Sequence, residues 1–273
     1  MPNKFGGPWT EIKLAVLQAY LLAYTTALKK QSFQLLYIDA FAGTGSVITN
    51  EGLLLNGSAK IAMETHGFDS YLFIEQDEKR CRELNHVCDE YRKHGMSIDV
   101  KRGDANEVLV SWLNAQSFVN VRGVAFLDPF GMNLEWTTLQ TIVDTHVMDV
   151  WYLFSLSGLY RQATRDPRQI DHGKATAITR VLGTDQWLEE FYHEPRQASF
   201  DFWNDVQYER VNVDFLETWV RRRLESVFAK VAQPLRLPKQ GPPRYSLFFG
   251  VSNPNPKAIG LAMKIANYIL EKA

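Results

Sequence analysis

An apolar segment at 35–38 leads through Asp39 into the sequence Ala40-Phe41-Ala42-Gly43-Thr44-Gly45. Gly43 and Gly45 can adopt backbone angles that other residues avoid, and without side chains they let a ligand approach the main chain closely. In open parallel sheets, ligands bind beyond the carboxyl ends of the strands. This spacing therefore favours a strand, a glycine turn and a site for a nucleotide-like ligand.

Acidic residues stand at or just beyond the ends of the first four predicted strands, at Asp39, Glu75, Asp104 and Asp128. A carboxylate after the second strand can accept two hydrogen bonds from a ribose diol, and Glu75 fits this role. Asp104 could receive an adenine amine, and Asp39 could hold a cationic amino-acid group. Because Asp39 would repel a pyrophosphate, we expect a cofactor without phosphates. The predicted cofactor-binding residues are Asp39, Phe41, Ala42, Gly43, Thr44, Gly45, Glu75, Gln76, Asp104 and Ala105.

Alternating helix and strand patterns must position these residues. Strands are predicted at 35–39, 71–75, 97–101, 121–128 and 149–155, and helices at 10–29, 58–66, 77–93, 105–115 and 135–145. This alternation is typical of a doubly wound parallel sheet with right-handed crossovers.

The pattern changes after the fifth predicted strand. Helices are expected at 173–193 and 212–230, a hairpin of strands at 232–237 and 245–252, and a closing helix at 256–272. We therefore predict a Rossmann-like α/β fold with a seven-stranded, mostly parallel sheet, a terminal antiparallel hairpin and helices on both faces. The chain is expected to form a single domain over 1–273, with an N-terminal helical extension at 1–33 and a helical elaboration at 159–230.

The segment 39–45 resembles the first motif of the class I S-adenosylmethionine-dependent methyltransferases, in the form found in nucleic-acid methyltransferases. Asp128-Pro129-Phe130-Gly131 resembles the fourth motif of amino-group methyltransferases, although that motif usually has two prolines before its aromatic residue. The resemblance implies that Asp128 and the Pro129 carbonyl accept hydrogen bonds from a target amine. It also implies that Phe130 stacks on an extruded base. From the residues alone, the alternative is that Asp128 is the N-cap of the following helix.

The whole chain is similar to the three-Cys-motif partner family of bacterial proteins, through segments 7–14, 39–45, 57–58, 73–75 and 126–131. This similarity implies a methyltransferase-like fold, S-adenosylmethionine as the cofactor, and a partner that carries a radical-SAM-like motif of three cysteines. Two functions follow as expectations. The first is methylation of an exocyclic amine in DNA or RNA, and the second is a catalytically inactive module that binds the cofactor or a partner protein.

Charge is unevenly distributed along the chain. Residues 1–150 contain 13 basic and 18 acidic residues, whereas 151–273 contain 17 and 13. A basic second half permits contact with nucleic acid, although solvated helix faces are the better explanation for any one cluster. Cys81 and Cys88 are expected to be small buried hydrophobes, and no residue pattern indicates a metal site. With no apolar stretch that could span a bilayer and no signal peptide, a cytoplasmic location is expected.

Glu75 follows Asp39 by 36 positions, whereas roughly 20 separate a glycine turn from the ribose-binding acid in dinucleotide-binding folds. The additional residues, at 46–56, are predicted to form a loop that arches over the cleft as a lid.

Overall fold

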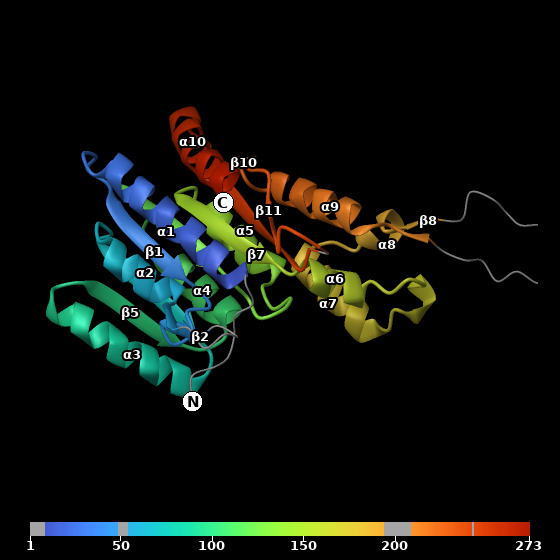
Figure 1. Ribbon diagram of the computed structural model, residues 1–273, viewed down its shortest axis with the longest axis horizontal. Helices are drawn as coiled ribbons and strands as arrows, with labels where there is room; N and C mark the ends of the chain where they lie inside the picture. Colours follow the sequence, from blue (N-terminus) through green and yellow to red (C-terminus); the bar gives the residue numbers. More distant parts are fainter. Residues whose placement is uncertain (1–8, 49–53, 194–208, 242) are drawn as a thin grey trace, which may run out of the picture.

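The computed structural model describes residues 9–48, 54–193, 209–241 and 243–273, and its centre is one mixed sheet (Figure 1). The strand order is β10-β12-β7-β6-β1-β4-β5, and β11 also pairs with β12. The strands from β7 to β5 are parallel to one another, while β12 is antiparallel to β7. These strands are β1 (Gln34–Asp39), β4 (Ser70–Glu75), β5 (Ser97–Arg102), β6 (Val121–Leu127), β7 (Met148–Phe154), β10 (Lys230–Val231), β11 (Leu235–Leu237) and β12 (Tyr245–Val251). The predicted α/β fold with a mainly parallel sheet is confirmed.

The sheet has eight strands rather than the predicted seven. The strand expected at 232–237 is shorter, because β11 covers only 235–237, and an additional short strand, β10, precedes it at 230–231. Both pair with β12. Pro234 lies in the gap between β10 and β11. Because proline has no amide hydrogen to donate, it interrupts the ladder, and the edge strand continues only after it.

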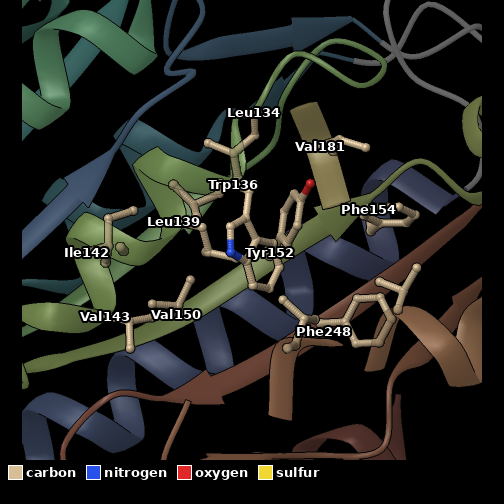
Figure 2. Packing of buried hydrophobic residues seen from close by; sticks show 14 of the residues in the cluster. Leu134, Trp136, Leu139, Ile142, Val143, Val150, Tyr152, Phe154, Val181 and Phe248 are labelled. Carbon is tan, nitrogen blue, oxygen red and sulfur yellow. The ribbon is translucent and has the colours of Figure 1, made fainter. Parts of the chain in front are cut away.

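Helices cover both faces of the sheet, because the side chains of each central strand alternate between two cores. Leu36 and Ile38 of β1 belong to one core, while Leu35 and Tyr37 belong to the other. The first core is shared with α4 (Ala105–Asn114), α5 (Trp136–Asp144), α7 (His172–Leu182) and α9 (Val213–Glu225). The second is shared with α1 (Trp9–Leu28), α2 (Ser58–Thr65), α3 (Glu78–Lys93) and α10 (Pro256–Lys272). Figure 2 shows the first core, where Trp136, Leu139 and Val143 of α5 lie over Val150 and Tyr152 of β7.

The segment predicted as one helix at 173–193 is three elements instead. The first, α7, ends at Leu182, because Gly183 has a φ of +68° and terminates the helix in the left-handed conformation. A Cβ on Gly183 would lie 2.1 Å from the Trp136 ring, so only glycine fits. The others are α8 (Trp187–Glu190) and β8 (Tyr192–His193), and β8 pairs with β9 (Glu209–Arg210). The helix predicted at 212–230 ends at Glu225.

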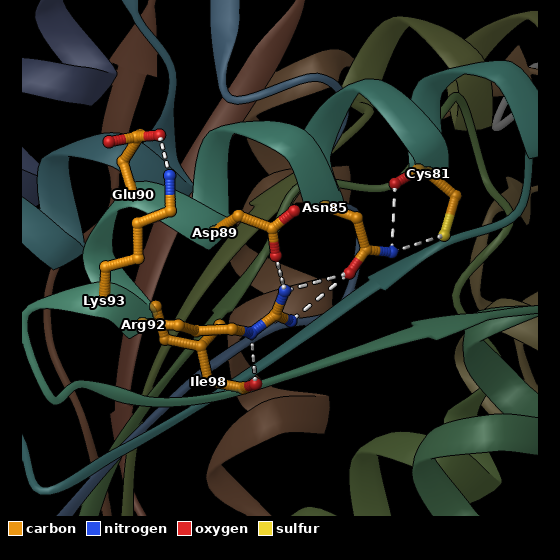
Figure 3. Close-up of polar contacts among 7 residues, drawn as sticks. All are labelled: Cys81, Asn85, Asp89, Glu90, Arg92, Lys93 and Ile98. Carbon is orange, nitrogen blue, oxygen red and sulfur yellow. Dashed lines mark hydrogen bonds and ion pairs between the residues drawn. The ribbon is translucent and has the colours of Figure 1, made fainter.

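A polar network fastens α3 to β5 (Figure 3). The Arg92 guanidinium donates to the Ile98 carbonyl at 3.1 Å, to Asp89 at 2.8 Å and to Asn85 at 3.2 Å. Cys81 lies in the same helix and, like Cys88, is buried and free of a disulfide.

The remaining helix, α6 (Leu156–Gln162), follows β7. In Figure 1, helices α6 to α9 form a group on the right, on the opposite side of the molecule from α3. Among the described residues, no helix combines the length and the apolar character that crossing a membrane requires. The division into a core, an N-terminal extension and an elaboration remains a prediction.

Candidate functional site

The predicted glycine turn follows the carboxyl end of β1 directly. The register of the sheet aligns Asp39 with Phe73 of β4 and Phe126 of β6, so the ends of the three strands lie side by side. The Ala42 amide donates to the Ile74 carbonyl at 2.9 Å, which draws the turn toward β4. Gly43 and Gly45 have φ values of +62° and +79°, and this turn therefore needs glycine at both positions.

The two ends of the insertion at 46–56 lie next to each other, because the residues that flank it, Gly45 and Gly57, are in contact. The Gly57 amide donates to the Gly45 carbonyl at 2.8 Å, and a Cβ on Gly57 would lie 2.9 Å from the Gly45 carbonyl carbon. Between them, β2 (Ser46–Ile48) and β3 (Leu54–Asn56) form an antiparallel hairpin. Helix α2 therefore begins at the position it would occupy if the glycine turn led into it directly, without the hairpin. The tip of the hairpin lies outside the described residues, and its role as a lid remains a prediction.

Glu75 stands at the carboxyl end of β4 and is 6% exposed. Its Oε2 accepts the Gly43 amide at 3.0 Å, and its Oε1 accepts the Asp77 amide at 2.8 Å and pairs with Arg80 at 3.1 Å. Each carboxylate oxygen can accept two hydrogen bonds, so Oε2 keeps a second position for a ribose hydroxyl. Glu75 is thus fixed beside the turn, and Gln76 next to it is exposed.

Asp39 has the most unusual electrostatic environment of the predicted site residues. It is fully buried, and this burial raises its pKa to about 7, although the Ser58 hydroxyl and the Phe41 amide both lower it. Its Oδ1 accepts the Phe41 amide at 3.2 Å. Its Oδ2 makes no well-formed hydrogen bond within the part of the chain that the structure describes, although the Ser58 hydroxyl lies close enough to lower the pKa of the carboxyl. A buried acceptor without a well-formed hydrogen bond is costly, and a cationic ligand group would satisfy it.

Asp104 lies after β5, but its carboxylate is already used locally. It is the N-cap of α4, and its Oδ1 accepts the Asn106 amide at 2.8 Å. Asn106 in turn accepts hydrogen bonds from the Glu135 amide and the Thr138 hydroxyl, both at 2.9 Å, which joins α4 to α5. Ala105 is buried. The predicted contact of Asp104 with an adenine amine would therefore have to share a carboxylate that caps a helix.

Asp128 follows β6 and forms an ion pair with Lys13 of α1. The two side chains are 26% and 12% exposed. The alternative that Asp128 caps the next helix is wrong, because α5 begins at Trp136 with Glu135 at its N-cap position. Pro129 is buried, and Phe130 is 75% exposed.

Lys13 was not among the predicted site residues. Its segment belongs to the family resemblance, but no local spacing links it to Asp128, which lies 115 positions away. The two charges also act on Asp39, because Asp128 raises the pKa of Asp39 and Lys13 lowers it. The structure thus brings Asp39, Asp128 and Lys13 into one electrostatic group at the carboxyl edge of the sheet.

Several of the basic residues in the second half serve internal contacts. Arg236 pairs with Asp214 at 2.7 Å and with Glu217 at 2.6 Å. Arg223 donates to the Leu182 carbonyl at 2.9 Å and stacks on Trp136. These arginines stabilise the fold and are poorly placed to follow a phosphate backbone. Among the described residues, no cluster of histidine, cysteine and acidic side chains could hold a metal ion.

No protein-family model matches the chain, and no curated protein matches it. Several solved structures are similar in part. Protein LPL1258 from Legionella pneumophila is 13% identical over 94% of this chain and 92% of its own, with a TM-score of 0.48. Trm1 from Pyrococcus horikoshii, solved with S-adenosyl-L-methionine, is 11% identical over 99% and 78%, with a TM-score of 0.43. The methyltransferase domain of a bacterial Hen1 protein is 13% identical over 86% and 98%, with a TM-score of 0.39. At these values we infer nothing about this chain's chemistry from the neighbours.

Proposed function

We propose that the chain binds S-adenosylmethionine at the carboxyl edge of the sheet and acts as a methyltransferase. The observation that carries this proposal is the buried Asp39 carboxyl, whose Oδ2 makes no well-formed hydrogen bond among the described residues and which stands beside a turn that requires glycine. Asp39 would hold the cationic amino-acid end of the cofactor, and Glu75 would accept its ribose hydroxyls. When bound, the cofactor supplies an electrophilic methyl group on a sulfonium.

The proposed substrate is an exocyclic amine of DNA or RNA. Asp128 and the Pro129 carbonyl would accept hydrogen bonds from this amine, and the exposed ring of Phe130 would stack on the base that carries it. The resemblance to the three-Cys-motif partner family supports a second protein in the reaction, one with a radical-SAM-like motif of three cysteines.

Calorimetric titration with S-adenosylmethionine and S-adenosylhomocysteine tests the cofactor site. We expect Asp39→Asn to weaken both by at least about tenfold, because a charge-assisted hydrogen bond is lost. Asp149→Asn is a matched control, since Asp149 is also buried, with a pKa raised to about 7, but lies at the opposite edge of the sheet. Wild-type affinity should fall as the pH drops below 7, because protonated Asp39 cannot pair with a cation, and Asp39→Asn should remove this dependence.

Equal affinity of wild type and Asp39→Asn at pH 8 would reject the proposed site. The transfer step is tested separately, with labelled methyl groups and DNA or RNA substrates. Asp128→Asn should retain the cofactor and lose transfer.

A second candidate is a binding module without transfer activity. The ion pair between Lys13 and Asp128 favours it, because the carboxylate that should receive the target amine is already held by an amine of α1. Tight cofactor binding with no transfer to any DNA or RNA, in wild type and in Lys13→Met alike, would support this candidate over the enzyme.

A further inference from the structure

A cavity of about 340 Å³ lies at the other edge of the sheet, between α1 and α10. Its apolar wall includes Leu28 of α1 and Leu261 and Ile265 of α10, and Figure 1 shows these two helices side by side. Arg122 and Asp149, which stand at the starts of β6 and β7, also line the cavity. Because parallel strands start at one edge and end at the other, the length of β6 separates this cavity from Asp128, roughly 20 Å.

The one acidic residue among the described residues that line the cavity is Asp149, which is 7% exposed. Its Oδ2 accepts the Tyr20 hydroxyl at 2.6 Å, and Tyr20 is fully buried. A carboxylate has two oxygens and room for several donors, so this bond leaves Asp149 able to accept more. The residues that carry the proposed methyl transfer include neither Asp149 nor Tyr20, and a buried carboxyl that only serves the fold is costly to keep.

Positive charge also lies around the cavity, close to Asp149. Arg122 stacks over the Phe33 ring at 4.3 Å and donates to the Val121 carbonyl at 2.6 Å, so its guanidinium is held in place. Lys257 lies in the first turn of α10, whose aligned peptide dipoles add further positive potential at that end. An acid and the cations beside it thus line an apolar chamber.

We propose that this cavity binds a small zwitterion with an apolar body, of the kind represented by an aliphatic α-amino acid. The ammonium group would pair with Asp149, the carboxylate would face Arg122 and Lys257, and the side chain would lie against Leu28, Leu261 and Ile265. The volume stands at the lower end of the range for ligand sites and suits a molecule of this size rather than a nucleotide. Arg122 lies close enough to Asp149 to lower its pKa, so opposite charges stand near each other in the cavity. A ligand with a single charge would therefore meet one group of like sign: a cation would face Arg122 and Lys257, and an anion would face Asp149.

Ligand-observed NMR titration with three probes tests the assignment. L-leucine carries both charges, leucinamide lacks the carboxylate, and 4-methylpentanoate lacks the ammonium. We expect leucine to bind and each analogue to bind at least about tenfold more weakly, because each loses one charge-assisted contact. Asp149→Asn keeps an oxygen for the Tyr20 hydroxyl and should weaken leucine by at least about tenfold. It should not weaken 4-methylpentanoate, because the substitution removes a charge of the same sign as that probe.

Ala258→Trp provides a second variant, since Ala258 is a half-buried cavity residue of α10 and the indole would fill the space. It should abolish binding of all three probes while the circular dichroism spectrum stays that of wild type. No saturable binding of leucine by the wild type up to about 10 mM, or equal binding by Asp149→Asn, would overturn the proposal. Leucinamide binding as tightly as leucine would overturn the zwitterion assignment. None of these outcomes depends on S-adenosylmethionine.

Discussion

Two buried carboxyls, Asp39 and Asp149, mark opposite edges of the same sheet, and burial raises the pKa of each to about 7. They differ in their partners. Asp149 accepts the Tyr20 hydroxyl at 2.6 Å, whereas Oδ2 of Asp39 makes no well-formed hydrogen bond among the described residues. A charged group is energetically unfavourable at both buried positions. An acid there is explained better by a ligand that it binds than by a contribution to stability.

The raised pKa values predict how the free energy of unfolding depends on pH. Both acids have a lower pKa in the unfolded chain, so the folded state binds more protons between about pH 4 and pH 7. Their contribution is fully present below the unfolded pKa and is lost as the pH rises through 7. We expect the ligand-free protein to lose stability between pH 5 and pH 8, by on the order of 2 kcal/mol per acid, in urea unfolding experiments.

Asp39→Asn is the control for this pH effect, because an amide keeps the shape of the acid and does not titrate. The variant should lose less stability than the wild type over the same interval. An identical pH profile in both proteins would mean that Asp39 does not titrate in this range.

The Lys13–Asp128 pair predicts a measurable coupling between α1 and β6. Because both side chains are largely shielded from water, the pair should exceed the surface average, with a coupling energy of about 1 kcal/mol. The measurement is a double-mutant cycle of Lys13→Met and Asp128→Asn in urea unfolding. Additive effects of the two substitutions would show that the contact contributes nothing to stability.

For single residues, the sequence predicted where the acidic side chains lie in the fold better than which groups they contact. Asp39, Glu75 and Asp128 stand at strand ends as expected, since the ends follow from the apolar runs before them. What each carboxylate contacts depends on tertiary approach. Arg80 reaches Glu75 from α3 and Lys13 reaches Asp128 from α1, and no local pattern encodes either contact.

At the scale of elements, the hairpin β2–β3 behaves as an insertion that can be removed. Ser46 pairs with Asn56, and the Gly45 carbonyl accepts the Gly57 amide at 2.8 Å. Deletion of 47–55 therefore leaves a four-residue turn from Gly45 to Gly57 with its closing hydrogen bond. We expect the shortened chain to keep its circular dichroism spectrum and a free energy of unfolding within about 1 kcal/mol of wild type.

The same deletion tests the predicted lid. A lid on the cofactor should make S-adenosylmethionine bind more weakly without it. Unchanged affinity, with the fold intact, would restrict the hairpin to another role.

The network on α3 predicts unequal effects for neighbouring residues. Arg92 is part-buried and contacts Ile98, Asn85 and Asp89, so Arg92→Ala should cost about 1.5 kcal/mol. Lys93 pairs with Glu90 at the surface at 2.7 Å, so Lys93→Ala should cost clearly less stability than Arg92→Ala. Thermal melts of the two variants make the comparison, and equal losses would contradict the assigned role of Arg92.

The central strands of the sheet could be predicted one by one, because buried parallel strands have nearly continuous apolar sequences and the helices between them have mixed polar and apolar sequences. The errors have identifiable causes. Pro234 divides the edge strand, and Gly183 stops α7 because its left-handed backbone packs against Trp136. Hydrophobic periodicity detects neither feature. The interruption at Pro234 depends on a missing amide hydrogen, and the helix end at Gly183 depends on a contact with a side chain of α5.

At the scale of the whole molecule, α1 connects the two edges of the sheet. Lys13, near its start, reaches the candidate cofactor site, while Leu28, at its end, lines the cavity beside α10. Between them, Leu17, Tyr20 and Leu21 are at most 1% exposed and belong to the core that covers one face of the sheet. This helix was predicted as an extension, and its burial indicates that it folds together with the sheet.

Leu17→Ala tests whether α1 folds with the sheet. Because Leu17 is 1% exposed, truncating it should lower the free energy of global unfolding by about 3 kcal/mol and keep one urea transition of unchanged slope. Leu22→Ala, on the same helix but 48% exposed, should cost less than about 1 kcal/mol. If α1 were an appendage, Leu17→Ala would instead release the helix in a separate early transition and leave the main midpoint unchanged. A single transition at lower urea would show that both sites are supported by one cooperative unit.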